Sequence, residues 1–471
     1  MENKTVEINN TNSNMTKKIV SLGLLALLFS GLYYITQGMG DVFKYIVAAL
    51  LGGLSCVLVN KNIATFNDAL RPIMPEYIEG RMKRAELAAT SFALSFGLVV
   101  GFGIPFSIGS PIILAHSILL GSDIIGTWCP DSKKGTIMSA VIGGLYGVGV
   151  VYGLEIVVQL FAMLPVNFLD ALGQVGAPVV AAFAVFPAIV VGYQYGFKKG
   201  IITFAIVALV NQLVMTFGKI KVGESVISLS PDGMALLVGV IIMLGFAMRE
   251  KSDGSNSNQV LIGIFEQRLK NIKKNVFIIA VMGGLVAAAT SLMFFAGDPT
   301  SLKLLAEGKT MEAGISAAAR AVGFIPLVYT TAITTGVYGP AGTTLVFVVG
   351  IIFMHNPILA FIVGALVMFL EVILLEKAAA GLDKFPGIKK SGDHVRTAMN
   401  KVLEIAIMAG SMMAGNALAP GTGFLFVAGA YALNKTAKKS MVEIAVGPVA
   451  VIALGILLNI LFVLGLYVPA V

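Results

Sequence analysis

Charged residues are scarce in this sequence, and their scarcity excludes an ordinary soluble domain. Aspartate, glutamate, lysine and arginine make up 12% of the 471 residues, whereas 57% of the residues are hydrophobic. A soluble domain carries about 25% charged residues. Many apolar runs approach or exceed the roughly 20 residues that a helix needs to cross a bilayer. We therefore expect an all-α polytopic membrane protein, since the alternating segments of a membrane β-barrel are missing.

Residues that commonly carry catalysis or bind metals are also few. The two cysteines, Cys56 and Cys129, and the three histidines show no metal or redox spacing. No Walker A motif is present, so ATP is not expected to be the energy source within this chain. The sequence thus predicts no cofactor, no metal site and no enzyme activity. The net charge of +8 does not indicate nucleic acid, because excess lysine and arginine in a membrane protein usually mark cytoplasmic loops.

The distribution of polar and apolar residues divides the chain into five parts. Residues 1–18 are polar and predict a disordered cytoplasmic tail. Residues 19–40 predict an extra N-terminal transmembrane helix, and the polar residues 249–274 predict a cytoplasmic linker between repeats at 41–248 and 275–471. About fifteen crossings, counted from a cytoplasmic N-terminus, place most lysines and arginines inside and the C-terminus outside.

The two halves of the chain resemble each other. "GFGIPF" (101–106) echoes "VGFIPL" (322–327), and "VIGGL" (141–145) echoes "IVGAL" (362–366) at the same spacing. Because each repeat has an odd number of segments, the second repeat is expected to be inverted. Inverted repeats are typical of secondary transporters, and we expect the architecture of an elevator-type carrier.

Proline and glycine interrupt one segment in each repeat, at 104–111 and 325–344. Unpaired backbone survives at membrane depth only inside protein or beside a wet cavity, so we expect broken or re-entrant helices that meet near the midplane. Helices that begin after Pro111 and Pro340 would direct N–H groups at a ligand. Alternatively, these residues only allow kinks and close helix packing. The predicted substrate-binding residues are Ser107, Gly109, Ser110, Thr330, Thr331, Thr334, Thr335, Tyr338 and Gly339.

Four ionisable residues lie in or near predicted spans, where a charge needs a partner or a function. They are Asp123, Arg320, Glu371 and Glu404. Arg320 precedes the second interruption, and we expect Glu371 or Glu404 to be its partner. The group either couples transport to an ion and neutralises an anionic substrate, or forms structural ion pairs.

Three stretches resemble the YhfT-like family: "FNDALRPIMPEYIEGRMKRAE" (66–86), "FEQRLKNIKKN" (265–275) and "AVGFIPLVYTTAITTGVYG" (321–339). This family comprises poorly characterised bacterial inner-membrane proteins that are regarded as transporters. The resemblance implies a multi-pass protein of the bacterial cell membrane, and it transfers no binding role to any residue. The general plan is also similar to that of elevator carriers, at the level of the fold only.

Together these features predict a secondary active transporter for a small polar metabolite, more often anionic than cationic. A proton or sodium gradient is the expected driving force, and a homodimer in the lipid bilayer is the expected assembly. One alternative is the membrane permease of a sugar phosphotransferase system, which would need separate phosphorylating subunits. A second alternative is an intramembrane enzyme, which would need carboxylates or histidines clustered in a cavity that opens to lipid.

Overall fold

The computed structural model is mostly helical, as the sequence predicts. The predicted tail (1–18) and most of the predicted linker (249–274) lie outside the residues that it describes. It describes residues 20–468 except 68–69, 72–73, 79, 100–102, 109, 111, 169–170, 172–173, 176, 223–224, 229–230, 251–268, 271, 340–341, 383–385, 439 and 442.

Helices begin and end close to the limits of the apolar runs. The first half of the chain contains the helix Val20–Thr36, α2 (Val42–Asn60), α3 (Met74–Ile78), α4 (Arg84–Leu98), α5 (Ile104–Ile108), α6 (Ala115–Trp128), α7 (Lys133–Ala162), α9 (Ala177–Tyr195), α10 (Phe197–Phe217) and α11 (Pro231–Arg249). The second half contains α13 (Val276–Ser291), α14 (Pro299–Ala306), α15 (Thr310–Thr335), α16 (Leu345–Ile352), α17 (Pro357–Leu382), α18 (Pro386–Leu418), α19 (Thr422–Thr436) and α20 (Glu443–Val463).

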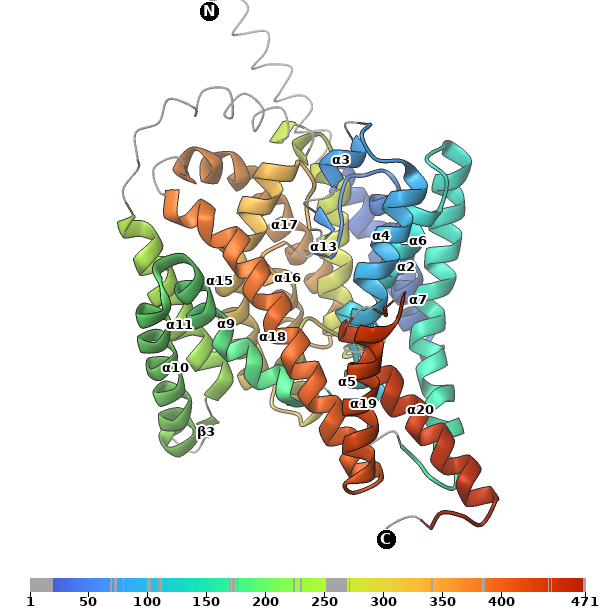
Figure 1. Cartoon of the computed structure of the whole chain (residues 1–471). Helices are drawn as coiled ribbons and strands as arrows, with labels where there is room; N and C mark the ends of the chain where they lie inside the picture. Colours follow the sequence, from blue (N-terminus) through green and yellow to red (C-terminus); the bar gives the residue numbers. More distant parts are fainter. Residues whose placement is uncertain are drawn as a thin grey trace, which may run out of the picture.

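Two very small sheets modify the all-α expectation. Strands β1 (Ile113–Leu114) and β4 (Phe295–Ala296) pair in parallel, and β2 (Lys219–Val222) pairs with β3 (Ser225–Ser228) in an antiparallel hairpin. The hairpin joins α10 to α11 and lies at the lower end of the molecule in Figure 1. Short strands of this kind lack the length that gives a periodic sequence signal.

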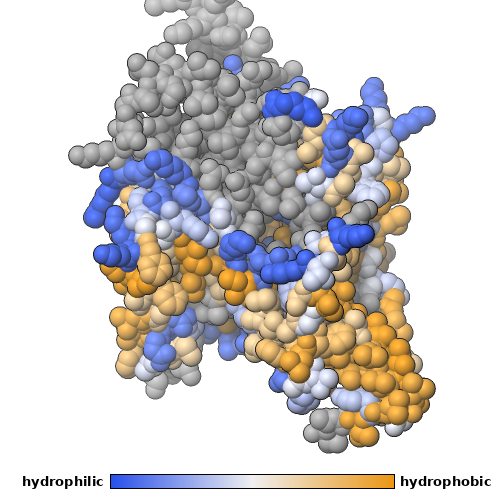
Figure 2. Space-filling view, viewed as in Figure 1, coloured by the Kyte–Doolittle hydropathy of each residue, from blue (hydrophilic) through white to orange (hydrophobic). Residues whose placement is uncertain are grey.

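Five helices are long and apolar enough to cross a membrane, so the chain is a multi-pass membrane protein. They are Val42–Asn60, Lys133–Gly153, Phe197–Phe217, Pro357–Leu375 and Val446–Val463, and four shorter apolar helices accompany them. The outward-facing side chains of α7 and α10 are large and hydrophobic, as lipid contact requires. Figure 2 shows further apolar surface over the C-terminal helices at the lower right.

Helices α2 and α13 form the centre of the packing. They contact each other, and each packs on one long helix of its own half, α2 on α7 and α13 on α17. Both are apolar on all sides, as is expected of buried helices, and Leu51, Leu58, Ile279 and Val286 have no exposed surface. Helices α9, α10 and α11 form a group at the left of Figure 1, while α18, α19 and α20 form a second group.

Candidate functional site

Each interrupted segment pairs with a loop from the other half of the chain. In the first half, the described residues between α4 and α6 include the five-residue helix α5 and strand β1, and β1 pairs with β4, which follows α13. In the second half, the chain between α15 and α16 is irregular, and Tyr338 pairs in parallel with Ala64, which follows α2. Each interruption is therefore completed by the loop that follows the first long helix of the other half.

Glu371 of α17 holds the second interruption in place. Its Oε2 accepts hydrogen bonds from the Tyr338 hydroxyl at 2.9 Å and from the Thr343 N–H at 3.0 Å. Its Oε1 accepts a third hydrogen bond, from the Thr343 hydroxyl, at 2.8 Å. Glu371 and Tyr338 are both buried. Three donors on one buried carboxylate stabilise its charged form and fix the segment to α17.

Gly342 makes this close approach possible. Its φ of 53° lies in the left-handed region, which favours glycine. A Cβ at this position would also collide with Glu371 Oε2. The irregular backbone and the carboxylate are thus packed with no space for a side chain between them.

Arg71 and Asp123 hold the partner loop from the first half. The Asp123 carboxylate on α6 accepts the N–H of Phe66 at 3.0 Å and the N–H of Asn67 at 2.7 Å. Arg71 is only 3% exposed, and its guanidinium packs against Gly339. Its charge interacts with Asp123 and with Tyr338. A buried cation therefore lies where the loop after α2 meets the second interruption.

The first interruption is held by its own hydroxyl groups. Ser107 is buried, donates to the Gly103 carbonyl at 2.7 Å and accepts the Leu114 N–H at 2.9 Å. Ser110 accepts the Ile112 N–H at 3.2 Å. These two predicted substrate-binding hydroxyls serve the local backbone in this structure. The predicted helix after Pro111 begins at Ala115, as α6.

Two other buried hydroxyls are available to a ligand. Thr65 Oγ1 and Thr344 Oγ1 have no hydrogen-bond partner among the described residues. Thr65 follows Ala64 and donates its N–H to the Tyr338 carbonyl, whereas Thr344 precedes α16. Both therefore lie beside the paired segments. Thr344 lies within the interruption that the sequence predicts as part of the site, whereas the loop that contains Thr65 was not among the predicted segments.

Several predicted residues cannot be placed in the site. Gly109 lies outside the described residues, as do Pro111 and Pro340. The description also does not extend to the side chains of Thr330, Thr331, Thr334 and Thr335, whose backbone forms the last part of α15.

Asp298 is the acid whose charge interacts with Arg320, and the pairing of Arg320 with Glu371 or Glu404 stays a prediction. Arg320 is buried on α15, and its charge interacts with Asp298 and His116. Asp298 caps the N-terminus of α14, where it accepts the Ser301 N–H at 2.8 Å. Because α15 packs on α14 as well as on α17, the charge of Arg320 lies close enough to this cap to interact with Asp298. Glu404 pairs with Lys401 at 3.0 Å.

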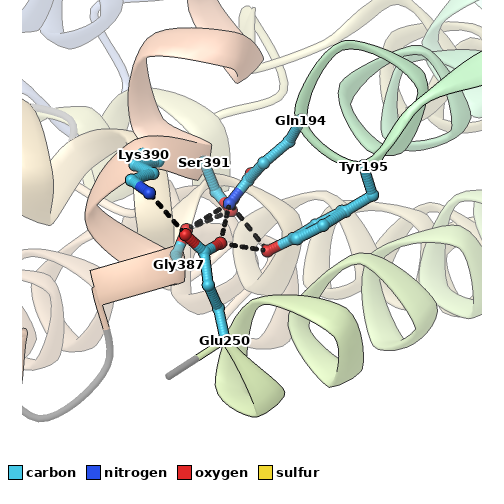
Figure 3. A network of polar contacts seen from close by, with 6 residues as sticks. All are labelled: Gln194, Tyr195, Glu250, Gly387, Lys390 and Ser391. Carbon is cyan, nitrogen blue, oxygen red and sulfur yellow. Dashed lines mark hydrogen bonds and ion pairs between the residues drawn. The ribbon is translucent and has the colours of Figure 1, made fainter. Parts of the chain in front are cut away.

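A second polar network connects three helices far from the interruptions. Glu250 follows α11, and its carboxylate accepts from Lys390 of α18 at 2.6 Å and from Tyr195 of α9 at 3.1 Å. Gln194 and Ser391 complete the network through the carbonyl of Gly387, as Figure 3 shows. This Glu250 network ties the ends of α9 and α11 to the start of α18. The sequence analysis missed it because its members are distant in the chain.

A cavity of about 560 Å³ opens over the paired segments. Ile63 and Gly336 line it, and these residues flank the pair formed by Ala64 and Tyr338. The remaining lining residues are Lys61, Asn62, Tyr77, Ile78, Gly80, Met82, Asp131, Lys274 and Asn275. Among the residues that the structure describes, no group of three histidine, cysteine or acidic side chains could hold a metal ion.

The buried position of Arg71 beside the second interruption was not predicted from the sequence. A signal was present, since Arg71 lies in the first of the stretches that resemble a known family. The distribution of lysines and arginines between the two sides of the membrane does not reveal a buried arginine, because every lysine and arginine is counted alike.

Comparison with known proteins supports one assignment. A family model described as "YhfT: Protein of unknown function" matches residues 44–467. The "Uncharacterized protein YhfT" of Escherichia coli (strain K12) is 35% identical over 442 residues, which cover 91% of this chain and 99% of that protein. No solved structure matches. A match that spans both interruptions and nearly all of the helices shows that this chain belongs to the YhfT family.

Proposed function

We propose that the protein is a secondary active transporter that moves a small polar, anionic metabolite across the bacterial cell membrane by alternating access. The observation that carries this proposal is the exchange of partners between the two interrupted segments. Irregular backbone in a membrane protein needs surrounding protein or a wet cavity, and here it has both. Transporters place their substrate sites at such interruptions.

The exchanged pairing supports two repeats with one architecture. Asn62 and Met293, which follow α2 and α13, both have a positive φ without being glycine. Two residues later in each loop, Ala64 and Phe295 pair with the interruption of the other half. Helix contacts are exchanged in the same way, because α11 packs on α15 and α20 packs on α4. A twofold relation between the halves accounts for each of these correspondences.

Helix crossings repeat as well. Small residues let membrane helices approach closely, and four crossings place one glycine against the backbone of another. The pairs are Gly52 with Gly143 (α2, α7), Gly283 with Gly364 (α13, α17), Gly192 with Gly200 (α9, α10), and Gly415 with Gly423 (α18, α19). The first two pairs correspond between the halves, as do the last two. Together with the odd number of membrane spans that the sequence predicts for each repeat, this correspondence supports an inverted second copy.

Within this carrier, Glu371 is the residue that we assign to ion coupling. Its carboxylate accepts three hydrogen bonds from the second interruption, so a proton on it would replace an acceptor with a donor and release the segment. The hydroxyl groups of Tyr329 and Tyr338 interact electrostatically with the Glu371 carboxylate. Asp123 accepts two backbone N–H groups of the loop after α2 in a similar way, and it is the second candidate for ion coupling.

Cysteine accessibility tests alternating access without knowledge of the substrate. Thr65 is fully buried and its hydroxyl has no described partner, so Thr65→Cys loses no hydrogen bond. In a Cys56→Ser, Cys129→Ser background, it should react with a membrane-impermeant maleimide in both right-side-out and inside-out vesicles. Ile137→Cys on α7 is the control, since Ile137 is 67% exposed on an apolar helix face and should react in neither.

Reaction of Thr65→Cys from only one side of the membrane would contradict the proposal. A thermal-shift screen against metabolites then supplies candidate substrates, and counterflow in proteoliposomes separates a carrier from a protein that only binds them.

A further inference from the structure

We propose that the cavity beside the paired segments is the entry site for the substrate, and that Lys61 and Lys274 bind a carboxylate or phosphate group of a soluble metabolite there. This inference rests on the proposed function, because it names the chemical class of the substrate and the place where it first binds.

The charges of the lining favour an anion. Lys61 and Lys274 line the cavity from the ends of α2 and the start of α13. Both are exposed, and within the described part of the chain neither forms an ion pair. Both ammonium groups can therefore interact with a ligand in the cavity that they line, and two such groups suit a carboxylate or phosphate.

The lining also contains an acidic side chain, which accepts a hydrogen bond from another lining residue. Asp131 accepts a hydrogen bond from the Tyr77 hydroxyl at 2.9 Å. The guanidinium of Arg84 lies 5.4 Å from the centre of the Tyr77 ring and adds a third positive charge behind this wall. Arg84 also reaches the Asn62 side chain at 3.4 Å. Asp131 is the one acid among the described lining residues and Lys61 and Lys274 are the two bases, so these residues carry a net positive charge.

The position of the cavity connects it to the transport site. Its lining includes Ile63, whose carbonyl accepts the Tyr338 N–H at 3.3 Å, and Gly336, which ends α15. An anion held by the two lysines is therefore next to the segment that Glu371 holds. The buried guanidinium of Arg71 lies beyond it, against Gly339. A volume of about 560 Å³ is within the range of cavities that take small molecules.

Lysine footprinting tests the site directly. The full chain in phosphatidylcholine nanodiscs is acetylated with an activated ester at low ionic strength, with inorganic phosphate or succinate as the probe. Modification of Lys61 and Lys274 should slow together, by about threefold at a probe concentration of twice the dissociation constant. Lys270, which is also exposed but lies outside the cavity, is the control and should not change. Chloride at equal ionic strength corrects for screening.

Substitutions of the two lysines distinguish a loss of positive charge from a loss of folding. Lys61→Gln with Lys274→Gln should weaken probe binding by about tenfold or more, whereas Lys61→Arg with Lys274→Arg and the control Lys270→Gln should retain it. Absence of protection by both probes, or equal protection of Lys270, would overturn the inference. Protection by phosphatidylglycerol nanodiscs alone, with no further effect of the probes, would assign the lysines to lipid headgroups and overturn it too. Alternating reactivity of Thr65→Cys would survive each of these failures, so the two proposals fail separately.

Discussion

The two interrupted segments differ in what holds them. In the first, the side chain of Ser107 bonds to Gly103 and Leu114 of the same segment, and only the backbone of β1 pairs with the other half. In the second, Tyr338 and Thr343 bond to Glu371 on a different helix, and Gly339 packs on Arg71 from the other half. The first segment thus relies on its own side chains and on one backbone pairing with the other half. The second changes shape whenever α17 or the loop after α2 moves, and it is the one that adjoins the cavity.

The contact between Gly342 and Glu371 gives the largest expected effect. Gly342→Ala adds a Cβ that collides with the carboxylate and places alanine at a positive φ. Loss of the hydrogen bonds to Glu371, added to the backbone strain, should lower the free energy of unfolding by about 3 kcal/mol or more. Thermal unfolding in detergent measures this loss.

Gly245→Ala on α11 is the matched control, because nothing lies within 4 Å of a Cβ there and stability should hardly change. If the collision is the cause, Glu371→Ala should remove most of the additional cost of Gly342→Ala in a double-mutant cycle. Strict additivity of the two substitutions would show that the segment does not depend on this carboxylate.

Ser107→Ala should have an intermediate effect, confined to the first segment. It removes the acceptor of the buried Leu114 N–H, and an unsatisfied buried donor costs about 1 to 3 kcal/mol. Ser139→Ala, also buried, removes only a bond to the Thr136 carbonyl and should cost less. Reactivity of Thr65→Cys should be unchanged by Ser107→Ala. A large change in that reactivity would show that the two segments are coupled and that the contrast between them is not real.

The Glu250 network should give the smallest effect, visible only at acid pH. The hydrogen bond from Lys390 lowers the pKa of the Glu250 carboxyl below its ordinary value. Its contribution is therefore complete above the ordinary pKa of glutamate and is lost as the pH falls through the lowered pKa. Lys390 is 56% exposed, so the contribution should stay below about 1 kcal/mol.

Melting temperatures of the wild type and of Glu250→Gln, measured between pH 3 and pH 7, check this small effect. The two proteins should differ slightly at neutral pH and converge in acid. A difference that grows in acid would have the wrong sign and would show that another group is responsible.

Much of the architecture follows from the apolar pattern alone. A run such as 276–291 has no polar face and can only be a buried or membrane helix, and α13 is both apolar and buried. The interruptions were predictable in part, because proline and glycine at membrane depth leave backbone groups unpaired. The predicted break over 325–344 is wrong for its first residues, since α15 continues through Pro326 to Thr335 and the irregular stretch begins at Gly336. The interaction partners of the buried charged residues could not be predicted from such patterns. The charge of Arg320 interacts with Asp298, which caps α14, and no local pattern in the sequence encodes that interaction.

Arg71 illustrates the same limit within the site. Its neighbourhood, with prolines and several charges, is typical of a membrane surface, and a surface arginine was the reasonable interpretation. Only the pairing of Ala64 with Tyr338 draws this stretch inward and buries the guanidinium. Pairings between positions so far apart in the chain cannot be predicted from one sequence, since many apolar segments would fit equally well.

The exchange of strand partners has a consequence for how such a protein arises. Strand β1 needs β4 and Ala64 needs Tyr338, so a polypeptide that contained only one half would leave its own interruption open. Such a half would be complete only as an antiparallel pair with a second copy, each closing the gap in the other. Under the proposed architecture of two repeats, a gene of half the length would thus have encoded an obligate dimer, and the fusion of two copies would have made that partnership permanent while freeing each copy to acquire its own charges.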